Sequence, residues 1–346
     1  LVAAALTGCS SQQPTTGETT DQAPSEFCPT SETTGTIKIS MSSPLAVFAP
    51  LLLGIETGAF EEAGIDIQIE RISSAQSLPM VAQGQLDAQI TSLSAFHFNA
   101  IQSGVELKWI APMDLQQELP PGTPVPGYWS RVDVVGPADN LDLMALKGAT
   151  VSSPTGGTGV GGKILDDALK RFGLTINDVN MTSLVGPDAL VALENGAVDA
   201  AWIAAPLEVE AAKNPELVPI AGYAPGVTGT SIIAGRSLLD RPQLLVRFLQ
   251  VLSDVTAKYL EGDYRANPET VKLLASAQET EERIVRESAL LDFDPTFSME
   301  GTAEFAEELQ AFLMERGELE YDEPISGTEV IDTRYTEALA SCARPE

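Results

Sequence analysis

The chain has 346 residues, of which 44% are hydrophobic, so it can bury the core of one large or two medium globular domains. Its 49 Asp and Glu residues against 20 Lys and Arg give a formal net charge of −29, which argues against binding to nucleic acid and against docking flat on anionic lipid. We expect most of this acidity to be solvated surface, because the sequence holds no Asp-x-Asp-x-Asp-Gly calcium loop.

The first nine residues predict a lipid anchor. The apolar run Leu1–Leu6 is followed by Gly8 and Cys9, as at the cleavage site of a bacterial lipoprotein signal. We expect residues 1–8 to be a signal-peptide remnant, since the run is too short to span a bilayer, and Cys9 to carry a diacylglycerol. The alternative is an ordinary apolar N-terminus. The anchor would place the protein outside the cytoplasm, on the periplasmic side or outer face of a bacterial membrane, which it contacts only through the lipid.

The segment that follows is predicted to be a tether. Residues 9–35 are dominated by small and polar residues, which cannot bury enough surface to offset the entropy of ordering, so we expect a flexible leash. With Cys9 lipidated, Cys28 and Cys342 remain, and in an oxidising compartment we expect them to form a disulfide. No later segment has enough uninterrupted apolar residues for a transmembrane helix.

A faint internal repeat organises the next part of the chain. The sequence Gly84-Gln85-Leu86-Asp87-Ala88 recurs 112 residues later as Gly196-Ala197-Val198-Asp199-Ala200. Each copy reads as strands alternating with helices, which predicts parallel sheets with helices on both faces, and therefore two α/β lobes of the same plan. The first copy predicts strands at 37–40, 65–71 and 88–91 and helices at 51–63 and 78–83; the second predicts strands at 149–152, 179–184 and 200–204 and helices at 161–172 and 189–194.

After the second copy the chain is expected to return to the first lobe. A short apolar strand is predicted at 230–234, and helical patterns follow at 238–260, 268–277, 281–291 and 302–315. We therefore assign residues 36–133 and 232–346 to lobe 1 and residues 134–231 to lobe 2, with hinge strands near 131–135 and 230–233. Such a cleft can close on a small ligand by hinge motion.

Ligands of parallel α/β sheets bind beyond the carboxyl ends of the strands, beside helix N-termini. The loops at those positions are rich in hydroxyl groups and in free backbone N–H groups, although Ser and Thr could also serve only as helix caps. The predicted ligand-binding residues in these loops are Ser42, Ser43, Ser74, Gln76, Thr91, Ser92, Ser153, Thr155, Gly156, Gly157 and Thr158.

The glycine-rich run Gly156–Gly162 resembles two nucleotide-binding motifs without completing either. Asp178 precedes its predicted strand instead of ending it, so the ribose contact of a dinucleotide site has no support. Ile164 stands where a P-loop needs Ser or Thr to bind Mg²⁺. We therefore expect an anion-tolerant loop and no cofactor.

Catalysis has little support in the sequence. The single histidine, His97, lies between Phe96 and Phe98, a setting typical of a packed side chain, and no Ser-His-Asp arrangement or metal-ligand cluster is evident. We expect no catalytic residues, no metal site and no enzyme activity. A secreted enzyme that uses His97 as its base is the alternative.

Aromatic and basic side chains are scarce, so each is a candidate for the cleft. Trp202 lies at the carboxyl end of the last predicted strand of lobe 2, and both Trp202 and Pro206 are predicted to contact the ligand. Arg71 and Arg131 lie near predicted strand ends. Either could pair with an anionic ligand group or form a structural ion pair.

Four motifs resemble one known family. They are the run Ala49–Asp66, Gly84–Asp87, Leu143–Gly148 and Ala192–Ala200. Together they resemble substrate-binding proteins of ABC transporters of the nitrate/sulfonate/taurine type, whose relatives bind pyrimidine precursors of thiamine. The resemblance covers about residues 37–260 and implies the two-lobed α/β fold of type II periplasmic binding proteins, each lobe a mainly parallel sheet flanked by helices with the ligand cleft between them.

Two departures from the family bear on function. Ala205 precedes Pro206 where the family often places an acidic residue, which weakens the case for a ligand with an amine there. The cysteine-rich iron-binding motif of related pyrimidine synthases is missing between Cys28 and Cys342, which excludes that chemistry.

The sequence thus predicts a monomeric, lipid-anchored solute receptor that delivers a small molecule to an ABC permease in the membrane. A sulfonate- or nitrate-like anion is the favoured ligand, because hydroxyl-rich loops at helix starts suit anions. The alternatives are a pyrimidine-type thiamine precursor as the ligand, a secreted enzyme on the same scaffold, and a sensory lipoprotein.

Overall fold

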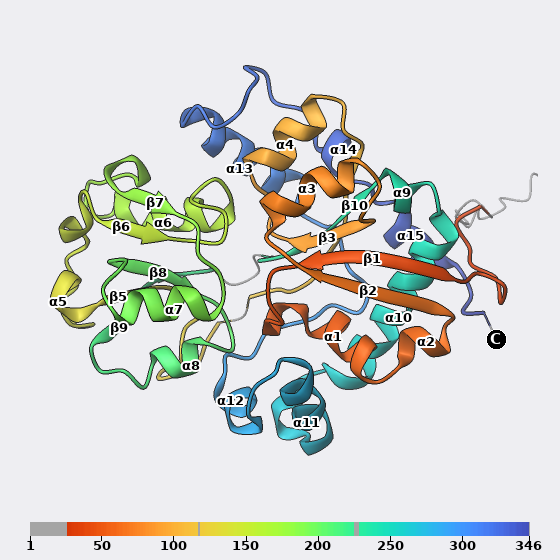
Figure 1. Cartoon of the computed structure of the whole chain (residues 1–346), viewed down its shortest axis with the longest axis horizontal. Coiled ribbons are helices and arrows are strands. Elements are labelled where there is room, and N and C mark those ends of the chain that lie inside the picture. The colour runs from red at the N-terminus through yellow and green to blue at the C-terminus, as the bar shows by residue number, and fades with distance from the viewer. Residues whose placement is uncertain (1–25, 117, 225–227, 346) are drawn as a thin grey trace, which may run out of the picture.

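The computed structural model describes residues 26–116, 118–224 and 228–345 and contains two five-stranded sheets, one in each lobe (Figure 1). The first sheet has the order β2-β1-β3-β10-β4 and the second the order β7-β6-β8-β5-β9. The strands of the first sheet are β1 (Gly35–Met41), β2 (Ile65–Arg71), β3 (Ala88–Thr91), β4 (Leu107–Pro112) and β10 (Ser231–Gly235). Those of the second are β5 (Gly127–Arg131), β6 (Thr150–Ser152), β7 (Asn180–Thr182), β8 (Ala200–Ile203) and β9 (Leu217–Gly222).

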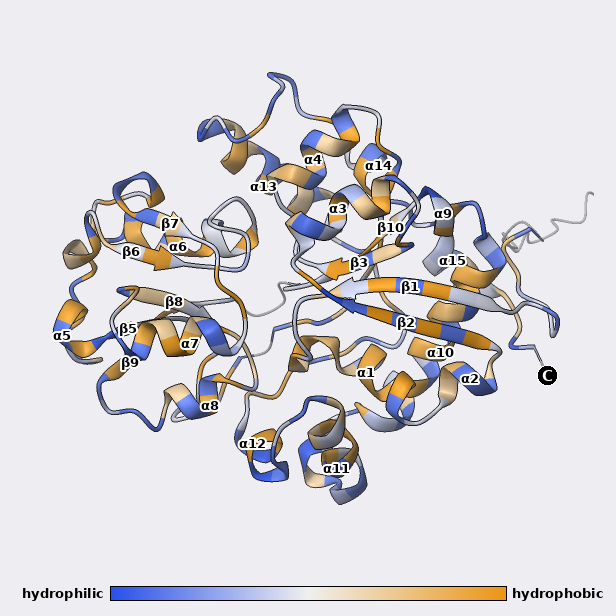
Figure 2. Cartoon of the chain, in the orientation of Figure 1, coloured by the Kyte–Doolittle hydropathy of each residue, from blue (hydrophilic) through white to orange (hydrophobic). Residues whose placement is uncertain are grey.

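The two sheets share one plan, which confirms the predicted α/β fold with two lobes. β1 runs parallel to β2 and β3, and β6 runs parallel to β7 and β8. One strand of each sheet, β10 or β5, is antiparallel to both of its neighbours. Each sheet is therefore mixed, with four of its five strands running in one direction. Figure 2 shows apolar residues on β1 and β3 of the first sheet and on β6 of the second, as expected for strands covered on both faces.

Helices cover both sheets. Lobe 1 carries α1 (Ala49–Glu56), α2 (Ala59–Glu62), α3 (Ser74–Ala82), α4 (Ala95–Gln102), α9 (Arg236–Leu239), α10 (Pro242–Tyr259), α11 (Pro268–Ala277), α12 (Glu282–Glu287), α13 (Thr302–Glu315), α14 (Gly327–Val330) and α15 (Arg334–Ser341). Lobe 2 carries α5 (Val132–Val135), α6 (Val160–Lys170), α7 (Pro187–Glu194) and α8 (Glu208–Ala211). The helix predicted at 51–63 is two helices, because Gly58 takes a left-handed conformation (φ 73°) between them. The helix predicted at 78–83 begins earlier, because Ser73 and Gln76 form a capping box at its N-terminus.

The repeated Gly-x-x-Asp motif has a structural role in both lobes. Asp87 accepts a hydrogen bond from the backbone N–H of Lys38 on β1 (2.8 Å), and Asp199 accepts one from the N–H of Thr150 on β6 (2.9 Å). The backbone N–H of Asp87 also donates to the carbonyl of Lys38, and that of Asp199 to the carbonyl of Thr150, at 2.8 Å in each case. The motif therefore anchors the strand after the second helix of each copy against the first strand.

The chain passes between the sheets twice, after β4 and again after β9. The first crossing runs from Pro112 to Gly127 and the second from Gly222 to Ser231. β5 pairs with β8 and β9, so it lies in the second sheet, whereas the boundary expected after residue 133 would leave it in the first. Residues 288–293 run beside the first crossing, where Leu115 and Asp292 exchange two backbone hydrogen bonds of 2.9 and 3.0 Å.

The predicted disulfide is present between Cys28 and Cys342, whose Cα atoms lie 5.3 Å apart. It joins the start of the described chain to the end of α15, on the side of lobe 1 away from lobe 2 (Figure 1). Phe27 packs on Tyr335 beside it, with ring centroids 5.3 Å apart. Cys9 and the tether up to residue 25 lie outside the described residues.

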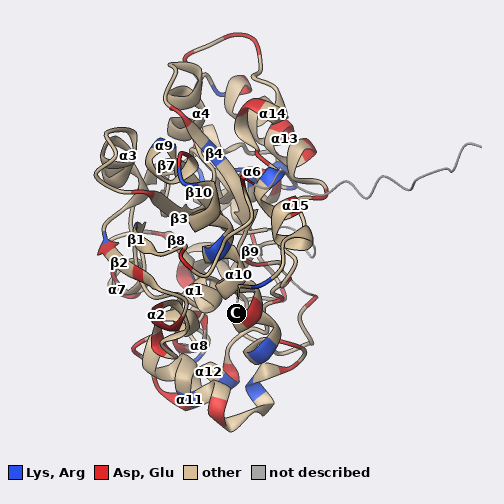
Figure 3. Ribbon diagram, turned by 90° about the vertical axis from the view of Figure 1, so that its right-hand side faces the viewer, with Lys and Arg blue, Asp and Glu red and all other residues tan. Residues whose placement is uncertain are grey.

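Within the described residues, the helices are too short or too polar to cross a membrane. Figure 3 shows the positions of Asp and Glu, in red, spread along the ribbon over several helices, with fewer Lys and Arg positions, in blue, among them. The same part of the chain holds no group of three or more His, Cys, Asp or Glu side chains placed to bind a metal ion.

Candidate ligand site between the lobes

A cavity of about 80 Å³ lies between the two lobes. A cavity needs about 10–15 Å³ of such volume to hold one water molecule, so this one has room for roughly six waters or one small organic molecule. It lies at the carboxyl ends of the strands, as expected for a ligand site in α/β sheets. Its described lining residues are Ser40, Met41, Ser42, Leu45, Val47, Phe48, Ile72, Ser73, Ser74, Ile90, Thr91, Ser92, Gln116, Pro126, Pro154, Val185, Trp202, Ala204, Ala205, Tyr223, Thr230 and Leu291.

Lobe 1 contributes a wall of hydroxyl groups. Ser42 follows β1, Ser74 begins α3 after β2, and Thr91 ends β3, so the parallel strands bring these three side chains to one edge of the sheet. Within the described chain, the hydroxyls of these residues have no protein hydrogen-bond partner. They remain available to a ligand as donors or acceptors.

Lobe 2 contributes an aromatic wall. Trp202, at the end of β8, packs edge-to-face between Tyr128 and Tyr223, with ring centroids 5.1 and 5.0 Å away. Trp202 and Tyr223 line the cavity, and Phe48 does so from lobe 1. Such rings suit a flat apolar or aromatic ligand surface.

The two crossing segments contribute a third, polar wall. Gln116 from the first crossing and Thr230 from the second line the cavity, and both are bonded to the buried carboxylate of Asp114 behind them. Burial raises the pKa of Asp114 to about 6, against the lowering effect of its hydrogen bonds to Thr230 and Gln116. Burial, with the nearby charge of Asp114, also raises the pKa of Tyr223.

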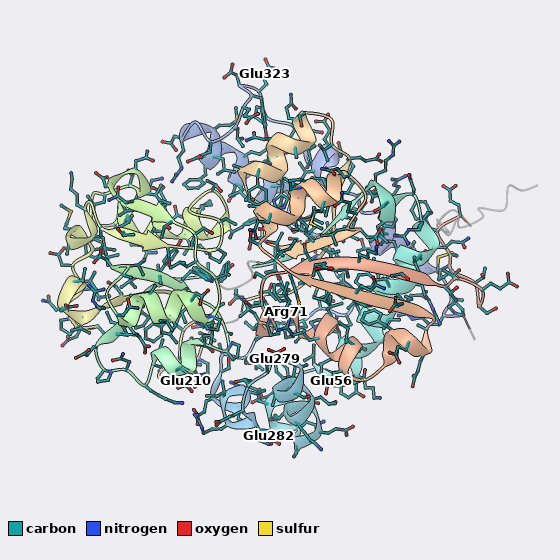
Figure 4. All side chains as sticks on the ribbon, viewed as in Figure 1. Glu56, Arg71, Glu210, Glu279, Glu282 and Glu323 are labelled. Carbon is teal, nitrogen blue, oxygen red and sulfur yellow. A yellow bond between two sulfur atoms is a disulfide. The ribbon has the colours of Figure 1, made fainter. Side chains whose placement is uncertain are left out.

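The cavity lining carries no charged side chain among the described residues. The remaining positions, 1–25, 117, 225–227 and 346, include no Lys or Arg. Arg71 is exposed and forms an ion pair with Glu279, as Figure 4 shows. Arg131 is held by the Val198 carbonyl (2.8 Å) and by Asp199 (3.4 Å). The sequence left open whether Arg71 and Arg131 pair with an anionic ligand or form structural ion pairs. Both form structural ion pairs.

Five of the predicted ligand-binding residues line this cavity, and the other eight do not. Those at the cavity are Ser42, Ser74, Thr91, Ser92 and Trp202. Those away from it are Ser43, Gln76, Ser153, Thr155, Gly156, Gly157, Thr158 and Pro206.

The glycine-rich loop is away from the cavity because it packs against lobe 1. The backbone N–H of Ala95, at the start of α4, donates to the Thr158 carbonyl (2.7 Å), and Gly159 forms a β-bridge with Ser94. The Gly157 N–H donates to the Ser153 hydroxyl (3.1 Å). The Thr158 hydroxyl donates to the Thr155 carbonyl (2.8 Å), so this hydroxyl and the Gly157 N–H, which were expected to face an anion, are bonded within the loop.

Other predicted residues have local roles. Gln76 caps α3, and Ser43 lies against Gly186 of lobe 2, where an added Cβ would come 2.8 Å from the serine hydroxyl. Pro206 follows a cis peptide bond, and the preceding Ala205 carbonyl accepts the N–H of Ala46 from lobe 1 (3.0 Å).

The lobes are further held together on the side of α8. The carboxylate of Glu208, which is fully buried, accepts the hydroxyl of Ser288 (2.5 Å) and the N–H of Ala289 (2.9 Å). Burial raises the pKa of Glu208. The two hydrogen bonds to Glu208, together with the contacts at Thr158 and Ala205, hold the two lobes against each other around the cavity.

His97 is a structural residue. Its Nδ1 accepts the backbone N–H of Ser94 (3.2 Å), so Nε2 carries the hydrogen and donates it to Gln89 Oε1 (2.9 Å). The side chain is completely buried, and this burial lowers its pKa to about 3. A ring that is neutral and bonded at both nitrogens cannot serve as the general base of the enzyme alternative.

Sequence reasoning missed the residues of the crossing segments, above all Gln116, Tyr223 and Thr230. None of the three belongs to the repeat. Gln116 and Tyr223 follow β4 and β9, strands that were not predicted, whereas Thr230 opens the strand predicted at 230–234 but was not named there as a ligand contact. For Gln116 the signal in the sequence was the polar run Asp114-Leu115-Gln116-Gln117-Glu118, which directly follows the apolar residues 109–113.

Comparison with known proteins supports the resemblance seen in the sequence. Residues 137–263 match the model of the family described as NMT1/THI5 like. No curated protein matches the chain at a significant level.

Three solved structures share the fold. The ligand-binding component of an ABC-type import system from Staphylococcus aureus, solved with zinc bound, has a TM-score of 0.67 at 12% identity, covering 88% of this chain and 99% of that one. The alkanesulfonate-binding protein SsuA from Xanthomonas axonopodis pv. citri, bound to MOPS, has a TM-score of 0.64 at 16% identity, with coverage of 85% and 97%. The periplasmic aliphatic sulphonate binding protein SsuA from Escherichia coli has a TM-score of 0.63 at 16% identity, with coverage of 87% and 93%. The comparisons therefore confirm the family resemblance over residues 137–263 and, for most of the chain, the fold of ABC-type ligand-binding proteins.

Proposed function

We propose that this protein is the solute-binding component of an ABC importer, anchored outside the cytoplasm by a lipid on Cys9, and that its ligand is a small uncharged ring compound of the pyrimidine class. The observation that carries the ligand class is the cavity between the lobes, whose described lining is aromatic and hydroxyl-bearing but has no charged side chain. Delivery to a permease and closure by hinge motion about the two crossings are part of the proposal, and the fold shared with ligand-binding components of ABC import systems supports them by analogy.

The charge of the cavity favours this ligand over the sulfonate- or nitrate-like anion that the sequence suggested. A buried oxoanion is stabilised by Arg, Lys or several aimed N–H groups. Here both candidate arginines are engaged elsewhere, and Asp114, the buried carboxylate behind the lining residues Gln116 and Thr230, is itself an acid. An anion would lose its hydration without gaining a cationic partner.

The walls of the cavity match the two faces of a heterocycle. Trp202 and Tyr223 can pack against a ring, which stabilises binding by about 0.5–1.5 kcal/mol beyond the area buried. In this proposal, the start of α3 and the hydroxyl of Ser74 bind an acceptor atom of the ligand ring, and Gln116 and Thr230 bind a donor group of the ligand. A ring that carries both a nitrogen acceptor and an amino group therefore satisfies both polar walls.

Intrinsic fluorescence gives a direct test, because only one of the three tryptophans lines the cavity. We expect 4-aminopyrimidine or cytosine to change the emission of the wild type, and Trp202→Phe to lose that change. Trp129→Phe is the matched control, since Trp129 is also buried but lies outside the cavity lining.

Methanesulfonate and nitrate serve as the competing ligand class in the same titration. Binding of either anion, with no response to the rings, would refute the proposed ligand. The anchor is tested separately: Cys9→Ala should release the protein from the membrane fraction, and retention there would refute lipidation at this residue.

A further inference from the structure

We propose that Asp114 sets the hydrogen-bonding polarity of the ligand site: it holds Gln116 and Thr230 so that both present acceptor oxygens to the cavity, and the site thereby selects ligands that donate N–H or O–H groups there. The inference rests on the proposed function, because it takes the cavity between the lobes as the ligand site. It makes Asp114 a positioning residue that acts through its two neighbours.

Asp114 joins the two crossing segments. Its Oδ1 accepts the backbone N–H of Thr230 (2.9 Å) and the Thr230 hydroxyl (2.6 Å), while its Oδ2 accepts the Gln116 side-chain amide (2.8 Å). The side chain is 1% exposed, so water does not compete for these bonds. No Lys or Arg of the described chain forms an ion pair with it, and hydrogen bonds alone balance its charge.

The orientation of the Gln116 amide follows from the carboxylate. An ionised carboxylate only accepts, so the group of Gln116 that faces Oδ2 must be the NH₂. Its Oε1 then lies on the other side of the amide, and within the described residues this oxygen has no protein partner. Because Gln116 lines the cavity, Oε1 is the acceptor that it offers to a ligand.

The hydroxyls beside Gln116 are committed in the same way. A hydroxyl has a single hydrogen, and Thr230 directs it to Asp114. Ser92, also in the lining, directs its hydrogen to the Gly229 carbonyl (2.6 Å). Both oxygens can therefore only accept from a ligand, so this wall presents three acceptors: Gln116 Oε1, Thr230 Oγ1 and Ser92 Oγ.

The remaining neighbour with a titratable group is Tyr223. A Cβ added at Gly229 would lie 3.0 Å from both the Tyr223 hydroxyl and Asp114 Oδ2, so the phenol and the carboxylate border the same small space. Burial raises the pKa of Asp114 to about 6. Above that pH the carboxylate enforces the acceptor wall, and below it a protonated Asp114 can donate to a turned Gln116 amide.

Asp114→Asn tests the inference with almost no change in shape. The Asn side-chain NH₂ would face the Gln116 NH₂, which cannot bond to it, so the Gln116 amide turns and presents N–H to the cavity. The probes are 4-aminopyrimidine, 4-methylpyrimidine, which replaces the donor by a methyl group of similar size, and methanesulfonate. Asp166→Asn is the matched control, because Asp166 is also buried and accepts a backbone N–H, from Ile176 (2.8 Å), but lies outside the cavity lining.

We expect the wild type and Asp166→Asn to bind 4-aminopyrimidine at least about fivefold more tightly than 4-methylpyrimidine, because the methyl group leaves buried acceptors unpaired. In Asp114→Asn this ratio should fall toward one, and methanesulfonate should bind more tightly than it does to the wild type. An unchanged ratio in Asp114→Asn would overturn the inference.

A second measurement separates this inference from the proposed function. The side-chain amide signals of Gln116 can be identified by their loss in Gln116→Leu, and they should move in Asp114→Asn but stay in place in Asp166→Asn. If no ring binds the wild type, the proposed ligand class fails, and the amide signals still decide the inference. Gln116 signals that do not respond to Asp114→Asn would overturn it.

Discussion

Acidification should leave His97 uncharged far below the pH at which an exposed histidine takes up a proton. Its ring is completely buried and bonded at both nitrogens, to Ser94 and Gln89. Burial lowers its pKa from 6.5 to about 3. At about 1.4 kcal/mol per pKa unit, this shift corresponds to roughly 5 kcal/mol.

The sign of the effect follows from which state binds the proton. The unfolded chain protonates His97 below pH 6.5, whereas the folded protein keeps it neutral until about pH 3. Unfolding therefore takes up a proton in this window, and the free energy of unfolding falls as the pH drops through it. The part already lost at pH 5 is about 2 kcal/mol.

The chain offers a clear assay, because His97 is its only histidine. With histidine labelled with ¹³C at the ring Cε1 alone, the protein gives one ring NMR signal. This signal should not shift between pH 8 and pH 4 in the folded protein and should titrate near pH 6.5 in urea. Denaturant unfolding of the wild type and His97→Gln gives the energetic counterpart: the wild type should lose about 2 kcal/mol relative to the variant between pH 7.5 and pH 5. A folded-state midpoint near 6.5, or parallel pH profiles for the two proteins, would refute the reasoning.

Two further predictions concern stability. Replacing Cys28 and Cys342 by Ser should lower the free energy of unfolding by about 2–5 kcal/mol, measured by thermal unfolding. A reductant should destabilise the wild type and leave the double variant unchanged. A wild type whose stability does not change with reductant would contradict this prediction. Gly162→Ala should destabilise lobe 2 by more than about 1 kcal/mol, because the added Cβ would lie 2.0 Å from the Gly157 carbonyl oxygen. Its neighbour is the control: Gly161→Ala meets its nearest atom at 3.5 Å and should gain up to about 1 kcal/mol from helix propensity, so equal melting shifts for the two variants would contradict the packing at this turn.

The parallel part of each sheet could be predicted from the sequence because its signals are local. Gly84 and Gly196 end their helices in the left-handed conformation, with φ of 70° and 77°. Asp87 and Asp199 each bond to a strand of their own copy. Every strand predicted in the two copies is present, and the repeat of 112 residues corresponds to the order β2-β1-β3 against β7-β6-β8. The hinge strand expected near 131–135 is wrong, because residues 132–135 form the helix α5.

The strands β4, β5 and β9 were not predicted, because their place depends on pairing with distant segments. β5 lies between β8 and β9, and β10 returns between β3 and β4, so each sheet is completed by chain that has crossed from the other lobe. No local pattern records which strand a crossing segment will pair with.

The candidate site divides in the same way. The sequence alone placed Ser42, Ser74, Thr91 and Trp202 correctly at the carboxyl ends of strands, because that edge follows from the α/β pattern. It could not show that α4 would pack on the glycine-rich loop and cover it. Nor could it show that the two crossing segments would meet where Thr230 bonds to Asp114, because these two residues lie far apart in the chain. Residue types along the chain determined which side chains lie at the sheet edges; only the tertiary packing decided the charge and hydrogen-bonding polarity of the cavity, because these depend on which distant groups are paired and buried together.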